Sequence, residues 1–287
     1  MYTNAVTVHA SVAREPESLS PRALLTFLLI TFALAWGILA LFIFFPEQMT
    51  ARVGQLSGRH PLFFLAVYSP AIAAWIIVAH HAGPGGFRRY LCRALLWRCS
   101  PGWWTFLLVG IPVIFIAGSW YKGNLFTEPL PFSSWQALLT GLFFAAIKGP
   151  VEEFGWRGLA LPLLQRKFTP LLAGLILGVI WGFWHLPAFL LSGTEQSEWS
   201  FAPFFLGCIA LSVIVTQLFN ASRGSILLPA VFHFTLMNPV FPDAQPYDTW
   251  LLIAVAAGVV WFNRQAMLTR HGAVTEVIPQ SRGRVNR

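Results

Sequence analysis

Residues 22–45 read RALLTFLLITFALAWGILALFIFF, and after Arg22 this stretch contains no Asp, Glu, Lys or Arg. An apolar run of about 20 residues is long enough to cross a bilayer as a helix. It is also too long for the apolar region of a secretory signal, so we expect a retained span. Similar blocks follow at 61–81, 103–121, 135–149, 171–191, 203–220, 225–240 and 249–263. The sequence therefore predicts an all-α, polytopic membrane helical bundle with about eight transmembrane helices.

The composition excludes several other classes of protein. Hydrophobic residues make up 56% of the chain and charged residues 10%, whereas roughly 25% of a soluble domain is charged. A soluble enzyme, a secreted disulfide domain and a disordered chain are therefore excluded. The three cysteines, Cys92, Cys99 and Cys208, have neither CxxC nor metal-site spacing, so we expect free thiols.

The distribution of basic residues predicts the topology. The net charge of +8 does not indicate nucleic-acid binding, because Lys and Arg lie in the loops and tails of a membrane protein. On the predicted spans, fifteen of the 19 lie on the side of both termini, three (Arg52, Arg59 and Lys122) on the other, and Lys148 within a span. Cytosolic loops are enriched in Lys and Arg. We therefore expect a multi-pass plasma (inner) membrane protein with both termini cytosolic.

The chain divides into three predicted parts. Residues 1–21 form a cytosolic tail, 22–268 the membrane-embedded domain and 269–287 a basic C-terminal tail. Within the 82–102 loop, apolar residues including Tyr90 recur at helical spacing, with Arg88, Arg89 and Arg93 on the opposite side. This spacing predicts a helix lying in the cytosolic headgroup layer, in contact with membrane lipid.

Ionisable residues inside a bilayer indicate a functional site, because burying them is costly. Only two acids, Glu152 and Glu153, sit within an apolar block, just after the fourth predicted span, and two histidines, His185 and His233, lie inside the fifth and seventh spans. They come from three separate helices. The presence of two acids and two histidines within the apolar blocks of one chain indicates a single site more strongly than any one of these residues does alone.

The stretch 148–158, KGPVEEFGWRG, predicts different tasks for the two glutamates. Pro150 should kink the helix, because proline cannot donate the backbone hydrogen bond. Glu153 and Arg157 are four residues apart and share a helical face, as an ion pair requires. Glu152 points about 100° away and is free to act as a base. The structural alternative is that both glutamates only cap and pair at a cytosolic helix end.

Each histidine taken alone is typical of a packed core residue. Beside Glu152, however, the two imidazoles could help to activate a water molecule or hold a metal ion. Glu152, His185 and His233 are acceptable zinc ligands that would leave one position open. A glutamate paired with histidine can equally act as a base without metal. The HExxH motif of many zinc proteases is absent.

Three stretches resemble the family of CAAX prenyl protease 2 (Ras-converting enzyme) and the bacteriocin-processing, or abortive-infection, intramembrane proteases. The family motifs are EExxxR, [FW]xxxH and HxxxN. Residues 152–157 match the first motif and 181–185 the second, and the resemblance covers a motif core at about 135–240. The third motif departs from the pattern, because Met237 occupies the position four residues after His233 and the amide is Asn238. Pro239 disfavours helical geometry at Asn238 and could return its side chain to the site.

The resemblance implies an intramembrane endopeptidase with a membrane-associated peptide or lipidated protein as substrate. It implies that Glu152 and His185 activate the water, and that His233, with Asn238, donates to the oxyanion. Glu153 and Arg157 would hold the kinked helix. Zinc or another divalent metal at Glu152, His185 and His233 stays open. So do two other classes: an inactive relative acting as an immunity or scaffold protein, and a proton-coupled transporter that uses Lys148 with the glutamate and histidines.

Overall fold

The protein is represented by a computed structural model that describes residues 19–127, 132–237 and 240–280, and every regular element in these parts is a helix. The α-helices are α1 (Arg22–Phe44), α2 (Pro46–Val53), α3 (Pro61–Val67), α4 (Ser69–Leu91), α5 (Pro101–Thr105), α6 (Ile111–Lys122), α7 (Trp135–Ile147), α8 (Gly149–Gly155), α9 (Leu161–Gln165), α10 (Pro170–Trp184), α11 (Phe201–Ala221), α12 (Leu227–Leu236), α13 (Tyr247–Phe262) and α14 (Arg264–Leu268).

Several helices are suited to crossing a membrane. Within the described residues, four helical stretches are long and apolar enough: Arg22–Phe44, Pro101–Lys122, Pro170–Leu190 and Phe201–Ala221. A fifth is the pair formed by α3 and the helix from Ser69 to Leu95, which is bent by 55°. The polytopic membrane bundle is therefore confirmed. The remaining predicted spans fall on α7, α12 and α13, which have 13, 10 and 16 residues, so the count of eight stays a prediction.

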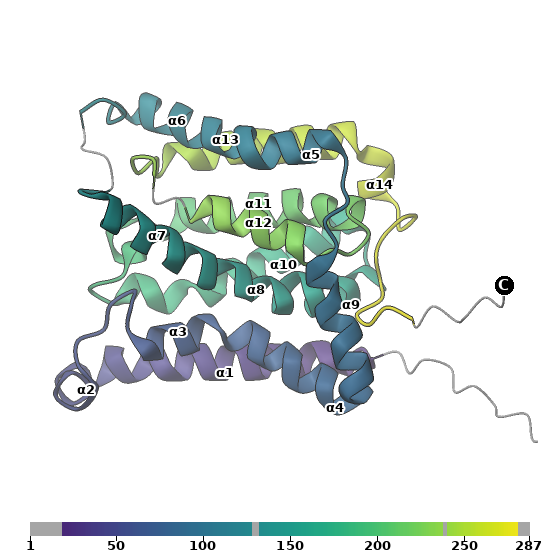
Figure 1. Cartoon of the computed structure of the whole chain (residues 1–287), viewed down its shortest axis with the longest axis horizontal. Coiled ribbons are helices and arrows are strands. Elements are labelled where there is room, and N and C mark those ends of the chain that lie inside the picture. Colours follow the sequence, from purple (N-terminus) through teal and green to yellow (C-terminus); the bar gives the residue numbers. More distant parts are fainter. Residues whose placement is uncertain (1–18, 128–131, 238–239, 281–287) are drawn as a thin grey trace, which may run out of the picture.

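The bundle has three tiers (Figure 1). α1, α3 and α4 form one outer tier, α5, α6 and α13 form the other, and α7, α8, α10, α11 and α12 lie between them. α11 packs extensively on both α10 and α13, and α4 packs on α1 and α8. These contacts enclose the middle tier, which contains the acidic motif helix and both histidines.

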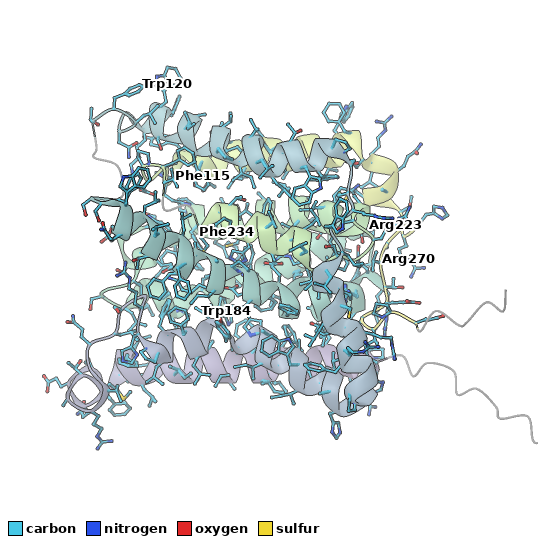
Figure 2. All side chains as sticks on the ribbon, in the orientation of Figure 1. Phe115, Trp120, Trp184, Arg223, Phe234 and Arg270 are labelled. Atoms are coloured by element: carbon cyan, nitrogen blue, oxygen red, sulfur yellow. The ribbon has the colours of Figure 1, made fainter. Side chains whose placement is uncertain are left out.

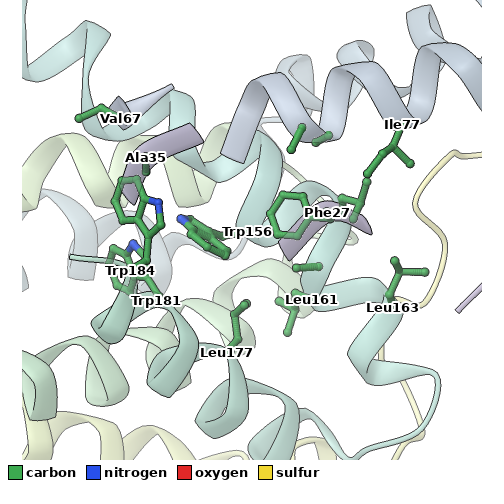
Figure 3. Packing of buried hydrophobic residues seen from close by; sticks show 14 of the residues in the cluster. Phe27, Ala35, Val67, Ile77, Trp156, Leu161, Leu163, Leu177, Trp181 and Trp184 are labelled. Carbon is green, nitrogen blue, oxygen red and sulfur yellow. The ribbon is translucent and has the colours of Figure 1, made fainter. Parts of the chain in front are cut away.

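Two apolar clusters hold the tiers together. The larger one joins α1, α4, α8–α9 and α10, and Figure 3 shows Phe27, Trp156, Leu161 and Leu177 within it. Phe27 meets Trp156 edge to face, with ring centroids 5.4 Å apart. The second cluster joins α5–α6, α11, α12 and α13. Side chains fill the spaces between the ribbons (Figure 2).

The fourth predicted span continues further than the sequence indicated. The helix breaks at Lys148 (φ −88°, ψ −83°), just before Pro150, and then runs through α8, a π-helical turn η3 (Trp156–Ala160) and α9. We expected a cytosolic segment from residue 155, but residues 155–165 are buried. Close approach explains this, because a Cβ on Gly155 would lie 2.5 Å from Pro70 of α4. Arg157 therefore belongs to the bundle interior and not to a cytosolic loop.

The helix predicted in the 82–102 loop is present, but one of its arginines is placed differently. α4 is kinked at Gly83 (φ 60°, ψ −172°), the residues from Pro84 to Leu91 form a helix beyond the kink, and Cys92–Leu95 form a 3-10 turn, η1. Tyr90 is fully buried and Arg93 is 2% exposed. The Arg93 guanidinium donates to the carbonyl oxygens of Gly158, Gly224 and Val277, at 2.7, 2.8 and 2.8 Å. Arg93 thus turns inward, where backbone acceptors from three distant segments bind its Nε and Nη1, while its Nη2 has no hydrogen-bond partner among the described residues.

The described ends of the chain lie at the same end of the bundle (Figure 1). Arg166 connects them, because its guanidinium donates to the carbonyl oxygens of Leu19 and Thr275 at 2.5 and 3.1 Å. Arg89 donates similarly to Pro279 at 3.0 Å. Residues 273–280 thus pack across this end.

Candidate active site

Glu152 is the buried carboxylate at the centre of the site. Its Oε2 accepts the indole N–H of Trp181 at 3.0 Å and that of Trp156 at 3.3 Å. Trp156 follows Glu152 by one helical turn, whereas Trp181 comes from α10. The residue is only 4% exposed, and Oε1 makes no hydrogen bond to any described residue. Two indole donors therefore fix one oxygen and leave the other available for chemistry.

Trp181 also positions His185. The Nδ1 of His185 lies 2.8 Å from the carbonyl oxygen of Trp181, and a carbonyl can only accept. Nδ1 is therefore the protonated nitrogen, and a neutral His185 presents an unprotonated Nε2. The bond is possible because α10 ends at Trp184, where the backbone enters a 3-10 turn. One tryptophan thus contacts both the carboxylate and the imidazole.

Glu153 holds a second histidine. Its Oε1 accepts from Arg157 Nη1 at 3.0 Å and from His233 Nδ1 at 2.8 Å. The expected ion pair between Glu153 and Arg157 is therefore present, but Glu153 has an additional partner in α12. All three residues are buried, with exposures of 1%, 0% and 6%. Because Nδ1 donates to the carboxylate, a neutral His233 presents its Nε2 as an acceptor.

Arg157 joins the two halves of the site. Its guanidinium carbon lies 4.8 Å from the ring centroid of Trp181, within cation–π range. Nε and Nη2 of Arg157 and Oε2 of Glu153 are buried without a hydrogen-bond partner among the described residues. Such a group persists only where the surrounding structure holds it in place. Arg157 therefore braces both Glu153 and the indole that binds Glu152.

A cavity of about 830 Å³ reaches the site, and Glu152, His185 and His233 all line it. Lys148 and Gly149, at the break between α7 and α8, contribute to its wall. Position 149 has no room for a side chain, because a Cβ there would lie 2.4 Å from Cδ2 of His233. Burial of the carboxylate and imidazoles beside an open cavity suits chemistry on a molecule that enters from outside.

The arrangement gives no support to the zinc alternative. Within the described residues, no three His, Cys, Asp or Glu side chains are grouped as a metal ion requires. Glu152, His185 and His233 line one cavity but do not converge on one point. We therefore derive no step through a metal ion. The three cysteines are free thiols, as expected.

The structure brings together five of the six site residues predicted from the sequence. Glu152, Glu153, Arg157, His185 and His233 meet in the middle tier. Asn238 lies outside the described residues.

Sequence reasoning missed the part played by the two tryptophans. A signal was available, because Trp156 lies four residues after Glu152 and Trp181 four residues before His185. Residues at this spacing share a helical face.

The part of the chain that contains the site is similar to known proteins. A family model described as "Type II CAAX prenyl endopeptidase Rce1-like" matches residues 133–237. CAAX prenyl protease 2 from Methanococcus maripaludis is 28% identical over 142 residues, which cover 46% of this chain and 52% of that protein. The match thus spans about half the length of this curated relative. Residues 133–237 contain all the described side chains that form the site, so the part of the chain that is similar to the Rce1-like CAAX prenyl endopeptidase family is the part that carries the site.

Proposed function

We propose that the chain is an intramembrane endopeptidase that hydrolyses a peptide bond near the C-terminus or membrane anchor of a membrane-associated or lipidated polypeptide. The observation that carries the proposal is Glu152, a buried carboxylate with one oxygen fixed by two indoles and a cavity beside it. The similarity of residues 133–237 to an endopeptidase family supports the reaction class. Both termini are cytosolic in this proposal, and the membrane is the plasma membrane.

Glu152 acts as the general base. Its Oε1 takes a proton from a water molecule, and the unprotonated Nε2 of His185 accepts the second water hydrogen and orients the oxygen. The water oxygen then forms a bond to the carbonyl carbon of the scissile peptide. When the carbon–nitrogen bond breaks, Glu152 returns its proton to the leaving amine. A positioned base of this kind contributes about 10²–10⁴-fold to rate.

His233 stabilises the oxyanion that forms during attack. Its Nδ1 is committed to Glu153, so only the imidazolium form can donate from Nε2. The Glu153 carboxylate supplies the countercharge, and Arg157, which binds the same oxygen, holds Glu153 in place. Asn238 is proposed as a second donor to the oxyanion. Glu153 and Arg157 thus act through His233 and Trp181 rather than on the substrate.

The two rival classes predict different behaviour of the same residues. A transporter would use Lys148, beside Phe63 with Nζ 5.8 Å from the ring centroid, as part of a proton relay. An inactive relative would keep the helices without turnover. The hydrogen bonds between the first two motifs favour the protease, because they leave acceptor atoms on Glu152 and His185 for one water.

Quantitative comparison of membrane peptides in cells tests the proposal. Cells with the wild-type chain are compared with cells carrying Glu152→Ala and with a matched control, Glu47→Ala, at an exposed position of α2. We expect a set of cleaved termini in the wild type and control that is missing with Glu152→Ala. Identical peptide sets in all three would contradict proteolysis. A proton-dependent flux of a solute lost with Glu152→Ala would then support the transporter.

A further inference from the structure

We propose that the substrate enters this site from the non-cytoplasmic face of the membrane. The substrate is then a polypeptide segment exposed at the outer surface, next to its membrane anchor, and not a tail held at the cytosolic face. This inference rests on the proposed function for its chemistry. Its geometric part, the side on which the cavity opens, is independent of catalysis.

Among the described residues, the exposed part of the cavity lining lies at one end of the bundle. It belongs to the segments that follow α2, the 3-10 turn η4 (Leu186–Leu190) and α12, and includes Ser57, Arg59, Glu195, Glu198 and Asp243. The buried lining residues include residues of the middle tier and of α1, α3 and α13. No residue of 88–102, 157–170, 221–226 or 264–280 lines it, and these described segments form the other end of the bundle. The route from solvent to Glu152 therefore begins at the end that contains α2 (Figure 1).

The opposite end is strongly basic. It contains nine described Lys and Arg residues, namely Arg22, Arg88, Arg89, Arg98, Arg166, Lys167, Arg223, Arg264 and Arg270, in addition to the buried Arg93. Figure 2 shows Arg223 and Arg270 there, far from Trp120 at the cavity end. The described basic residues at the cavity end are four: Arg52, Arg59, Lys122 and Lys148, whose Nζ lies beside Gly58. Lys122 pairs with Asp243 at 2.6 Å.

Lys and Arg accumulate on the cytosolic side of membrane proteins. The basic end, where the described chain ends meet, is thus cytosolic, and the cavity opens on the other side. The nine basic residues do not include Arg157, which is buried inside the bundle, so the asymmetry does not depend on it.

Exposed aromatic residues indicate where the bilayer ends. At the cavity end, Trp120, Tyr121 and Trp135 are 67%, 71% and 75% exposed. At the basic end, Trp97 and Trp261 are 61% and 68% exposed. Trp and Tyr gather at the two membrane interfaces, so these residues mark the two surfaces. The cavity mouth then lies at the outer interface, where a membrane-anchored peptide would meet it.

Cysteine labelling of intact cells tests the direction of opening. The probe is a membrane-impermeant maleimide, applied to a chain with Gln196→Cys in the cavity mouth and with Cys92 and Cys99 replaced by serine. Ser57→Cys is a second, independent position at the mouth. The native Cys92, exposed at the basic end of the wild-type chain, is the matched control.

We expect Gln196→Cys and Ser57→Cys to react in intact cells, and Cys92 to react only after the membrane is permeabilised. Labelling of Cys92 in intact cells, with the mouth positions protected until permeabilisation, would overturn the inference. Neither labelling result requires turnover. A failure of the proposed direction of opening can therefore be distinguished from a failure of the proposed protease activity. If the protease proposal holds, a bulky maleimide on Gln196→Cys should also reduce peptide cleavage.

Discussion

Trp181 donates its indole N–H to Glu152 across 3.0 Å, from a different helix. The same tryptophan accepts the Nδ1–H of His185 with its backbone carbonyl oxygen at 2.8 Å and lies against the guanidinium of Arg157. The first two motifs are therefore one unit joined through a single residue, Trp181. The positions of the base and of the imidazole that orients the water depend on each other.

Trp181→Phe should lower kcat/KM about 10–100-fold, because a hydrogen bond to a charged group contributes about 1.5–3 kcal/mol. The ring that contacts Arg157 and the carbonyl that binds His185 would remain. Trp184→Phe is the matched control, since the Trp184 Nε1 is buried without a partner among the described residues. Activity assays on both purified variants check this. Equal losses in the two would show that the donor to Glu152 is unimportant.

Glu153→Gln should destabilise the protein by about 3–5 kcal/mol, since breaking a buried pair leaves an uncompensated charge on Arg157. Adding Arg157→Met to it should restore much of the stability but not the activity, because His233 would still lack its carboxylate. Thermal unfolding in detergent gives the first quantity and peptide cleavage the second. Full activity in the double variant would remove Glu153 from the positioning of His233.

Gly149→Ala should reduce activity strongly, because the new Cβ would lie 2.4 Å from Cδ2 and 2.7 Å from Nε2 of His233. A displacement of about 1 Å at a catalytic group can cost about 10²-fold in rate. Gly258→Ala is the control: it lies in α13 with nothing within 4 Å of its Cβ. That change should leave the rate unchanged. Normal kinetics for Gly149→Ala would mean that His233 can move without consequence.

The two histidines should differ in the kind of loss they cause. His185→Ala should leave essentially no turnover, because the water loses its acceptor. His233→Gln keeps an N–H donor and should retain measurable activity, since removing one oxyanion donor costs about 10²–10³-fold and a replacement recovers part of it.

A chelator should not inhibit the wild type. Reversible inhibition by chelator, with zinc lost equally in both variants, would require a metal mechanism.

Local spacing was sufficient for some of these features and not for others. The Glu153–Arg157 pair follows from a separation of four residues on one helix, and it is present at 3.0 Å. The hydrogen bond between Glu153 and His233 could not be predicted from spacing, because it joins residues 80 positions apart through the packing of α12 on α8. The break at Lys148 was predictable because Pro150 cannot continue the helical hydrogen bonds.

Helical periodicity in the 82–102 loop gave the wrong surroundings for Arg93. Periodicity places arginine on the face opposite the apolar residues, toward solvent or lipid headgroups. In the structure, carbonyl oxygens of Gly158, Gly224 and Val277 accept from Arg93, and none of these residues is near it in sequence. A buried arginine becomes acceptable once such acceptors surround it. Only the tertiary arrangement could supply that information.

The rate of peptide cleavage by purified Glu152→Gln tests the central claim most directly. Glutamine preserves the shape of the side chain and can still accept from Trp156 and Trp181, but it cannot take a proton from water. We predict that cleavage of a fluorogenic membrane peptide falls about 10²–10⁴-fold, with unfolding temperature and peptide binding unchanged. Retention of more than about a tenth of wild-type activity would contradict the assignment of Glu152 as the base.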